Sequence, residues 1–422
     1  MTHALIFPTI GFASLVFLLP ASLVTAEPLP PAPNLMAKSA HLLPAKTTFY
    51  VELTDPGELI STIFDHPLRA KVEALPVYQQ AIQSPQYQQS MMGVEMVENL
   101  FGMSWREAIE TFAFGGIAVA GDFSSEGVAI VFHGKDAKSM EMFRDRVLGF
   151  AALDKDRKLQ HVEYRGIKAH RLDEIRFAVY ENKLLITNQS DLGKAILDRM
   201  LDGGDDHLGT QPKFIEASKQ RTSRTTTWAF VDVQAIRESG AADEFYYHQI
   251  NNPVGELLVG GIQSNLQHAP FVTAIVDVAT EGVTLKLSTP HQPDWIPEER
   301  EYFFGPDGNG KAPNLPRVGP TLFTLSTYRD FSQMWLRAGD LFDDNMNEEF
   351  AKADAGLTTF FSGKDFGEDI LGSFESPVGL VVTRQDFHDI MPQPAIKLPA
   401  FGPPPSTAQT PPSTRRRAIH RR

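Results

Sequence analysis

The chain has 422 residues, of which 42% are hydrophobic and 22% are charged, so it can bury a large core and is expected to form two or more domains. It contains no cysteine, which excludes disulfides, thiolate metal sites, cysteine nucleophiles and lipid attachment through an N-terminal cysteine. The formal net charge is −13, and removing the five arginines of residues 401–422 leaves −18, a charge that should repel nucleic acids from the folded body.

Residues 1–26 are predicted to be a signal peptide. Gly11 to Val24 is almost wholly apolar but short for a membrane span, and the small residues that end at Ala26 suit cleavage there. Only the α-amino group and His3 precede the apolar run, so an uncleaved anchor or a buried helix is the alternative interpretation. The sequence therefore predicts an exported protein, periplasmic or secreted, with no transmembrane anchor after cleavage.

A proline-rich linker is expected over 27–40, and a first α+β unit over 41–222. The unit opens with a predicted strand at 48–53, because β-branched, aromatic and aliphatic residues dominate there. Phe49, Val51 and Leu53 alternate with Tyr50 and Glu52 along this strand, which predicts one buried face. The residues expected on that face are Phe49, Val51 and Leu53, with Tyr50 and Glu52 on the other.

Two helix starts carry capping patterns. Asp55 is followed by Pro56 and by Glu58 three residues after the aspartate, and Ser104 is followed by Glu107 at the same spacing. An aspartate or serine at the N-cap accepts a bond from an otherwise unpaired backbone N–H, and a glutamate three residues on can complete a capping box. Helices are therefore predicted directly after Asp55 and Ser104.

The remaining elements of the first unit alternate between hairpins and helices. The expected order is a hairpin (117–132), a helix (137–150), a second hairpin (161–187) and a helix (190–201).

Two further units are expected. A second unit (223–290) begins with a strand near Thr227, and a third (320–400) begins with a strand near Leu322. A connection rich in proline and glycine (291–319) separates them, and a disordered tail of Pro, Ser, Thr and Arg (401–422) follows. The abrupt change of composition after Phe401 suggests that the third unit is incomplete.

The order strand, helix, helix, strand recurs in these segments. We therefore predict an α+β fold built from degenerate repeats of that order, with antiparallel hairpins, in two to three units. The alternative is that these segments are unrelated parts of an ordinary α+β fold whose strands and helices happen to follow the same order.

No sequence motif in the chain carries recognisable catalytic chemistry, so no catalytic, cofactor-binding or metal-binding residue is assigned. Asp307-Gly308-Asn309-Gly310 resembles part of a calcium loop, but the downstream glutamate is missing and Asn-Gly is itself a turn signal. Three histidines on predicted strands have no spacing that forces a zinc site, and are interpreted as satisfied or exposed. They are His133, His161 and His170.

Three other patterns have simpler interpretations than a functional site. Gly115-Gly116 with Gly121 lies between a helix and a strand, the wrong order for a phosphate cradle. Asn188-Gln189-Ser190 fits a glycosylation acceptor, but Ser190 also suits an N-cap, the interpretation we prefer. One acidic group is interpreted as a solvated helix face rather than a metal site: Asp340, Asp343, Asp344, Glu348 and Glu349.

The stretch from Leu42 to Glu52 resembles the start of an uncharacterised bacterial domain family whose members are largely exported or membrane-anchored. That start is a leucine-proline-alanine-aspartate-threonine pattern before a strand, and Lys46 stands here in place of the acid. The resemblance implies export and a repeated α+β build, and it implies no activity or catalytic residue.

The function expected from the sequence is non-enzymatic binding or structural work in the cell envelope or periplasm, with an unknown partner there. The alternative is a hydrolase whose carboxylates converge only in the fold. A cleft that holds two carboxylates with raised pKa values would favour the hydrolase.

Overall fold

A computed structural model describes residues 39–152, 159–222, 225–240, 242–280, 282–315, 321–384 and 400–402. The chain divides into two compact units: the first comprises 1–248 and 263–295, and the second comprises 249–262 and 296–422. The predicted signal peptide and almost all of the predicted linker lie outside the described residues. Within the described residues, no helix is both long enough and apolar enough to cross a bilayer.

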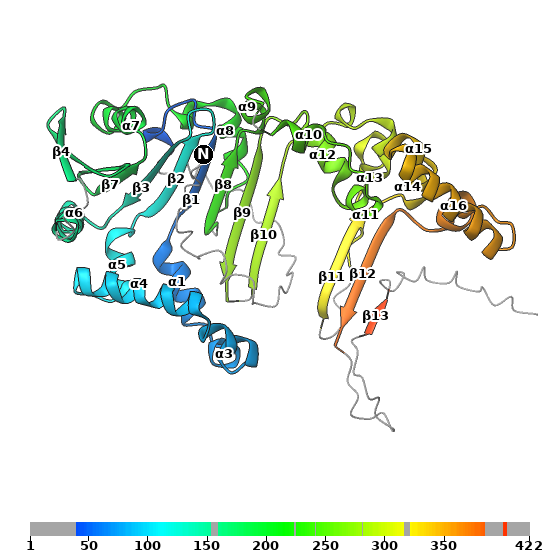
Figure 1. Ribbon diagram of the computed structural model, residues 1–422, viewed down its shortest axis with the longest axis horizontal. Helices are drawn as coiled ribbons and strands as arrows, with labels where there is room; N and C mark the ends of the chain where they lie inside the picture. Colours follow the sequence, from blue (N-terminus) through cyan, green and yellow to red (C-terminus); the bar gives the residue numbers. More distant parts are fainter. Residues whose placement is uncertain are drawn as a thin grey trace, which may run out of the picture. The chain divides into compact units, whose positions relative to one another are not determined.

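The first unit is built on a ten-stranded antiparallel sheet in the order β10-β9-β8-β1-β2-β3-β7-β6-β5-β4 (Figure 1). Helices lie on both sides of the sheet, so the predicted α+β class is confirmed. The strands are β1 (Phe49–Leu53), β2 (Gly116–Asp122), β3 (Gly127–His133), β4 (Leu159–Tyr164), β5 (Ile167–Leu172), β6 (Ile175–Tyr180), β7 (Lys183–Thr187), β8 (Thr227–Val231), β9 (Val272–Ala279) and β10 (Gly282–Ser288).

Most helices of the first unit lie between β1 and β2 or between β7 and β9. They are η2 (Ala40–Leu42), α1 (Pro56–Phe64), α2 (Arg69–Glu73), α3 (Pro76–Ile82), α4 (Pro85–Phe101), α5 (Trp105–Phe112), α6 (Ala137–Ala151), α7 (Ser190–Asp202), η3 (Leu208–Thr210), α8 (Pro212–Ser218), α9 (Val233–Glu238), α10 (Asp243–Tyr247) and η5 (Pro293–Trp295).

Both predicted helix starts are confirmed by their cap geometry. Asp55 accepts a bond from the backbone N–H of Glu58 at 2.9 Å, and Ser104 accepts one from Glu107 at 3.3 Å. The predicted cap at Ser190 is wrong, because Gln189 occupies the N-cap position of α7 and Ser190 is its first helical residue. These bonds mark where α1 and α5 begin.

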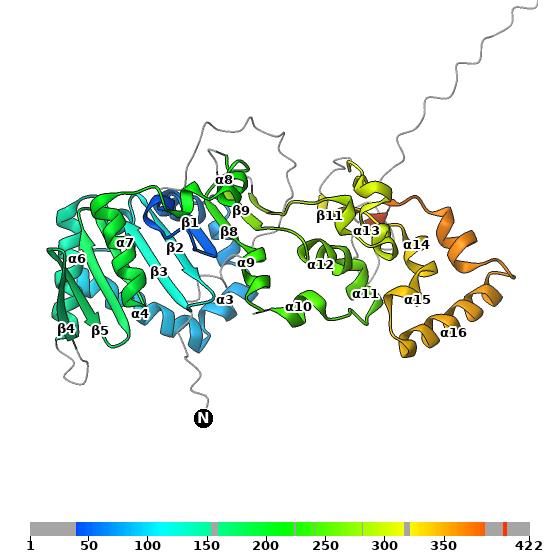
Figure 2. The same cartoon turned by 90° about the horizontal axis from the view of Figure 1, so that it is seen from above.

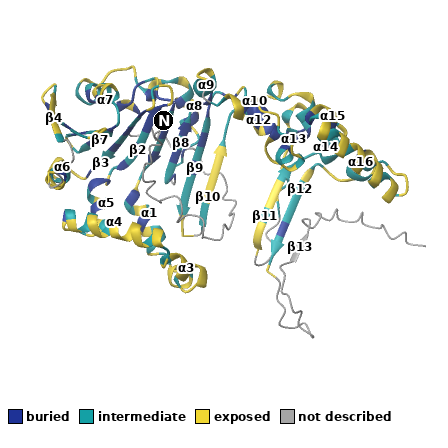
Figure 3. Cartoon of the chain, viewed as in Figure 1, coloured by how far each residue is buried: buried dark blue, intermediate teal, exposed yellow. Residues whose placement is uncertain are grey.

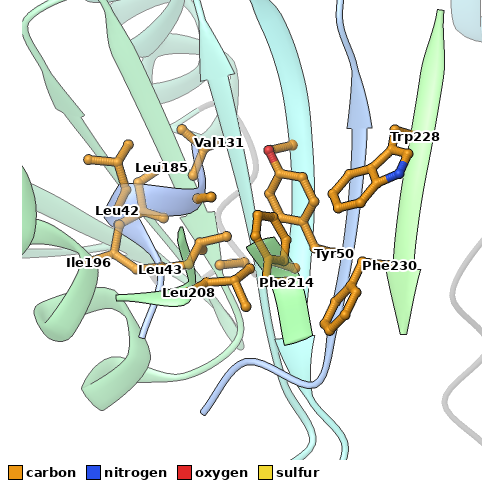
Figure 4. Close-up of a cluster of buried hydrophobic side chains, with 14 of the residues drawn as sticks. Leu42, Leu43, Tyr50, Val131, Leu185, Ile196, Leu208, Phe214, Trp228 and Phe230 are labelled. Carbon is orange, nitrogen blue, oxygen red and sulfur yellow. The ribbon is translucent and has the colours of Figure 1, made fainter. Parts of the chain in front are cut away.

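The face assignment of β1 was the reverse of what the structure shows. Tyr50 and Glu52 are buried, whereas Phe49, Val51 and Leu53 are only half-buried. Tyr50 packs against Phe214 of α8 and against the neighbouring Trp228 of β8 (Figure 4). The main core of the first unit therefore lies on the Tyr50 side, beneath α7, α8 and η2.

A second core lies on the opposite side of the sheet, toward the β4 end. Residues of α4, α5 and α6 pack there against β3 and β5 to β7. Phenylalanines form its centre: Phe101 stacks on Phe143, and Phe112 meets both rings. Aromatic pairs at about 5 Å add to the free energy of simple burial.

Two predicted boundaries differ from the structure. The single hairpin expected at 161–187 is four strands, because tight turns with positive φ at Arg165-Gly166 and at Glu181 fold each arm back on itself. Residues 223–290 do not form a unit of their own, because β8 pairs with β1 and joins the same sheet. The strand pairing is therefore continuous across the expected boundary at 222.

The second unit contains a three-stranded sheet in the order β11-β12-β13 and a group of helices, among them α14, α15 and α16, which adjoin one another (Figure 2). The expected tail begins within β13, so residues 401 and 402 are strand rather than disordered. The elements are β11 (Thr321–Tyr328), β12 (Pro377–Thr383), β13 (Ala400–Gly402), α11 (Pro253–Gly255), the π-helix η4 (Glu256–Gly260), η6 (Glu298–Arg300), α13 (Glu301–Phe304), η7 (Pro306–Gly308), α14 (Phe331–Leu336), α15 (Ala338–Leu341), α16 (Asp344–Phe360), the π-helix η8 (Phe366–Ile370) and η9 (Leu371–Ser373). A last helix, α12 (Gly261–Leu266), carries the chain from the second unit back into the first.

A buried ion pair anchors the core of the second unit. The Glu256 carboxylate is fully buried and accepts bonds from Arg300 at 2.6 and 3.0 Å and from the Tyr302 hydroxyl at 3.0 Å. Gly260 permits this arrangement, since a Cβ there would lie 2.1 Å from the Glu256 carboxylate. The bonds from Arg300 and Tyr302 thus stabilise a buried charge within the second unit.

The three expected repeats share one connection. In each, the first strand pairs antiparallel with the strand that follows its helices: β1 with β2, β8 with β9, and β11 with β12. That the three segments are related repeats of one sequence remains a prediction.

Candidate binding surface

The register of five strands places apolar residues in one continuous row across the first unit. Val119 of β2, Val51 of β1, Ala229 of β8, Ala274 of β9 and Leu287 of β10 are successive partners. Val276 and Leu285 pair in the next row on the same side. We call these seven residues the open face.

None of the seven side chains is fully buried, and exposure rises toward the sheet edge. Leu285 is 61% exposed and Leu287 is 67% exposed. Figure 3 shows most of β10 as exposed, in contrast to the buried and half-buried strands beside it. An ordinary solvated sheet face would carry polar side chains at these positions.

The open face begins where the second core ends. The helices α4, α5 and α6 meet this side of the sheet at β3 and at β5 to β7, whereas the open face lies on β2, β1, β8, β9 and β10. On the opposite side the same strands carry Tyr50, Trp228 and Ile275, which are buried. Apolar residues therefore line both sides of these strands, and only one side is fully buried.

Exposed apolar surface of this kind costs free energy in water, at about 25 cal/mol for each Å². Contiguous apolar patches on a folded protein mark places where a partner or ligand binds. The open face is therefore the strongest candidate functional surface in the described part of the first unit.

A pocket of about 300 Å³ lies elsewhere in the first unit, where β1 begins and β2 ends. It is lined mainly by small and polar residues: Ala45, Lys46, Thr47, Thr48, Asp122, Phe123, Ser124, Asp232, Ala235 and Ser239. Two carboxylates in one pocket invite comparison with a hydrolase.

The polar groups of this pocket already serve the fold. Asp232 caps α9 by accepting from the backbone N–H of Ala235 at 2.9 Å, and it accepts two bonds from Lys213, both at 2.9 Å. The Thr48 hydroxyl accepts a bond from the backbone N–H of Phe123 at 2.9 Å. The Thr47 hydroxyl donates to the Pro44 carbonyl at 2.7 Å.

The second carboxylate of the pocket, Asp122, is held in its charged form. Burial acts to raise the pKa of Asp122, but bonds from Ser124 and Ser125 and the charge of Lys46 outweigh it, so the pKa lies below its ordinary value. The Ser124 hydroxyl donates to Asp122 at 2.8 Å, and the Lys46 amine lies 3.8 Å away. A general acid needs a raised pKa, so Asp122 is not suited to protonating a leaving group.

The three histidines considered in the sequence do not converge. His133 forms a 2.6 Å bond with the Ser39 hydroxyl. His161 and His170 face each other across β4 and β5, with their Nδ1 atoms 2.9 Å apart. Among the described residues, no group of three or more histidine, aspartate or glutamate side chains is arranged to hold a metal ion.

The remaining patterns form local structure. Asp307 lies in a turn with φ 58°, and Asp343 caps α16 by accepting from Met346 at 2.9 Å. Gly116 has φ 109°, and a Cβ there would lie 2.8 Å from the Leu53 carbonyl oxygen. The Asn188 side chain bonds the backbone of Val128 and Glu126, both at 2.8 Å, which ties it to the β3 hairpin.

Comparisons with known proteins leave the chain without a family. No protein-family model matches it, and no curated protein sequence matches it. Among solved structures, crystal form IV of TP0453 aligns with a TM-score of 0.33 and 11% identity, covering 60% of this chain and 80% of that one. Crystal form III of TP0453 aligns with a TM-score of 0.31 and 11% identity, covering 59% and 78%.

Sequence reasoning missed the open face. Leu285 and Leu287 alternate with polar residues in β10, which was the available signal. The register of β9 and β10 against β1 and β8 could not be derived from local patterns.

Proposed function

We propose that this protein is a non-enzymatic binding protein of the cell envelope or periplasm that holds an apolar partner against the open face. The observation that supports the proposal is the apolar row from Val119 to Leu287, in which no side chain is fully buried. The resemblance of the Leu42 to Glu52 stretch to an exported family supports the compartment.

The two carboxylates of the pocket lined by Asp122 and Asp232 give little support to the alternative, a hydrolase. The lowered pKa of Asp122 does not suit a general acid, and the Asp232 carboxylate is engaged as the cap of α9 and as the partner of Lys213. The binding function makes no such demand, because it requires only accessible surface.

A fluorescent apolar probe, 1-anilinonaphthalene-8-sulfonate, tests the proposal on the folded protein. We expect saturable binding by the unmodified protein and at least a tenfold weaker affinity for Val51→Asn combined with Val276→Asn, which removes apolar side chains from the middle of the open face. Phe360→Asn is the matched control, because Phe360 is a highly exposed apolar residue of α16 in the second unit.

Equal probe affinity in all three proteins would contradict the proposal. Circular dichroism and thermal melting of each variant show whether a loss of binding reflects a loss of fold. A variant that melts normally and binds weakly supports the open face as the site.

A further inference from the structure

The outer edge of the first unit's sheet is β10, the terminal strand at that end. Thr284, Leu285, Lys286 and Leu287 are all exposed, so no described segment covers the strand on either side. Natural proteins guard such edges with charges, prolines or bulges, and β10 carries only one charge, at Lys286, in the run Val283 to Ser288.

The direction of the backbone groups in β10 follows from bonds further inside the sheet. The backbone N–H of Thr54 donates to the Thr226 carbonyl at 3.0 Å, and that of Asp232 donates to the Thr48 carbonyl at 2.8 Å. Even-numbered residues of β8 therefore bond to β1, and odd-numbered residues bond to β9, because successive residues point to alternate sides.

The same alternation carries through β9 to the edge. Ala229 bonds to its partner Ala274, so the next residue, Ile275, bonds to Lys286 of β10. Leu285 and Leu287 consequently direct their backbone N–H and C=O groups away from the sheet. Val283 has the same parity and direction.

These three residues form a self-complementary edge. A twofold axis through Leu285 places Leu285 opposite its own copy and Val283 opposite Leu287, which gives three hydrogen-bonded pairs, all of them apolar. The same register sets Lys286 opposite Thr284, whereas a shift of one residue pair would set Lys286 opposite itself and lose one of the three pairs.

We propose that two copies of this chain associate through β10, as antiparallel strands related by a twofold axis at Leu285. Pairing extends each ten-stranded sheet into the other. Leu285 then lies beside the partner's Leu285, and Leu287 lies beside the partner's Val283, all on the same side of the joined sheet. The two open faces then become one continuous apolar surface, although the association itself does not depend on the proposed ligand.

Two substitutions at one position separate backbone pairing from side-chain contact. Leu285→Pro removes an N–H that faces outward, so it breaks no bond to β9 but blocks the bonds to a second copy. Leu285→Thr removes the same apolar side chain and keeps the N–H. Sedimentation velocity over a wide concentration range should show a dimer for the unmodified protein, a weaker dimer for Leu285→Thr and a monomer for Leu285→Pro.

A crosslink tests the register even if Leu285→Pro folds poorly. The chain contains no cysteine, so a single introduced thiol can only pair with a second copy. Leu285→Cys would lie at about 5.5 Å between Cα atoms in a hydrogen-bonded pair, within disulfide range. Leu287→Cys would lie four residues from its mate, roughly 13 Å along the strands, and should not crosslink.

A disulfide-linked dimer with Leu285→Cys and none with Leu287→Cys supports the proposal. An unmodified protein that stays monomeric at high concentration would overturn it, as would equal crosslinking of both cysteine variants. Loss of the dimer in Leu285→Pro together with normal probe binding would show that the binding function stands without association.

Discussion

The Arg221 guanidinium lies 2.7 Å from the Glu52 carboxylate, and both side chains are less than 5% exposed. Arg221 comes from the segment after α8 and Glu52 from β1, so the pair joins a helical layer to the sheet. The guanidinium also lies 5.1 Å from the centre of the Trp228 ring, in a cation–π contact. The positive charge of Arg221 therefore compensates the buried negative charge of Glu52.

Removing one member of this pair should destabilise the first unit strongly. Glu52→Gln or Arg221→Met leaves the other charge buried without its partner, which costs about 3–5 kcal/mol. The double substitution Glu52→Leu with Arg221→Met should recover most of this lost stability. Urea unfolding monitored by tryptophan fluorescence measures the free energy of unfolding of the single and double variants.

The exposed pair Lys219–Glu216 is the matched control for the buried one. Lys219→Met should change stability by about 1 kcal/mol or less, because exposed ion pairs are screened by water. Similar small effects at both pairs would show that Glu52 and Arg221 are accessible to water.

Ala120 and Val51 lie on opposite sides of the same sheet and offer a test of which side is covered. Ala120→Asp should cost several kcal/mol, because Ala120 is 1% exposed and the carboxylate would have no partner. Val51→Asp should cost clearly less, since the half-buried open face lets the new charge reach water. Thermal melts of the two variants test this difference. Equal losses of stability would mean that the open face is covered in solution.

Local features of the fold could be predicted, and non-local ones could not. The caps at Asp55 and Ser104 and the hairpin of β2 and β3 depend on neighbours within a few residues, and the sequence predicts them correctly. Alternation along β1 separated two sets of side chains without indicating which set was buried. Glu52 was expected opposite the buried face because its partner, Arg221, is 169 positions away.

The joining of residues 223–290 to the first sheet is non-local in the same way. It rests on the pairing of β8 with β1, and nothing within either strand specifies the other. The candidate pocket could not be predicted for the same reason, since Asp122 at the end of β2 and Asp232 at the cap of α9 are far apart in the sequence. Its role in packing became apparent only from hydrogen bonds such as that from Lys213.

Ser104 and Ser190 distinguish a helix cap from a neighbouring serine. Ser104→Ala should cost about 1 kcal/mol, the usual loss when an N-cap bond disappears. Ser190→Ala should change stability by less than about 0.5 kcal/mol, because Ser190 is exposed and lies one residue inside α7. Chemical denaturation of the two variants tests this ranking, and a larger loss at Ser190 would reverse the cap assignment.

Export predicts a defined N-terminus. Material recovered from the periplasm or medium should begin at Glu27, since cleavage is expected after Ala26. Intact-mass measurement and N-terminal sequencing check this. Protein that retains Met1 and fractionates with membranes would instead support the uncleaved anchor.

His170 should make stability depend on pH near neutrality. Burial chiefly lowers the pKa of His170, with the nearby His161, Arg144 and Lys168 acting in the same direction and Asp145 opposing them. The Nδ1 atoms of His170 and His161 lie 2.9 Å apart, so the bond between the two rings has room for a single proton.

The sign follows from proton binding in the two states. The unfolded chain, with a histidine pKa of about 6.5, binds a proton at a higher pH than folded His170 does, so the free energy of unfolding falls as pH is lowered from about 7 through 6.5 and below. His170→Phe should reduce this slope, because phenylalanine keeps the contact with Phe177 and does not titrate. Burial also lowers the pKa of His291, so a smaller slope should remain. Urea unfolding at a series of pH values between about 5.5 and 7.5, above the range in which carboxylates titrate, measures the difference. Identical slopes for the unmodified protein and His170→Phe would show that the pair is already open to solvent.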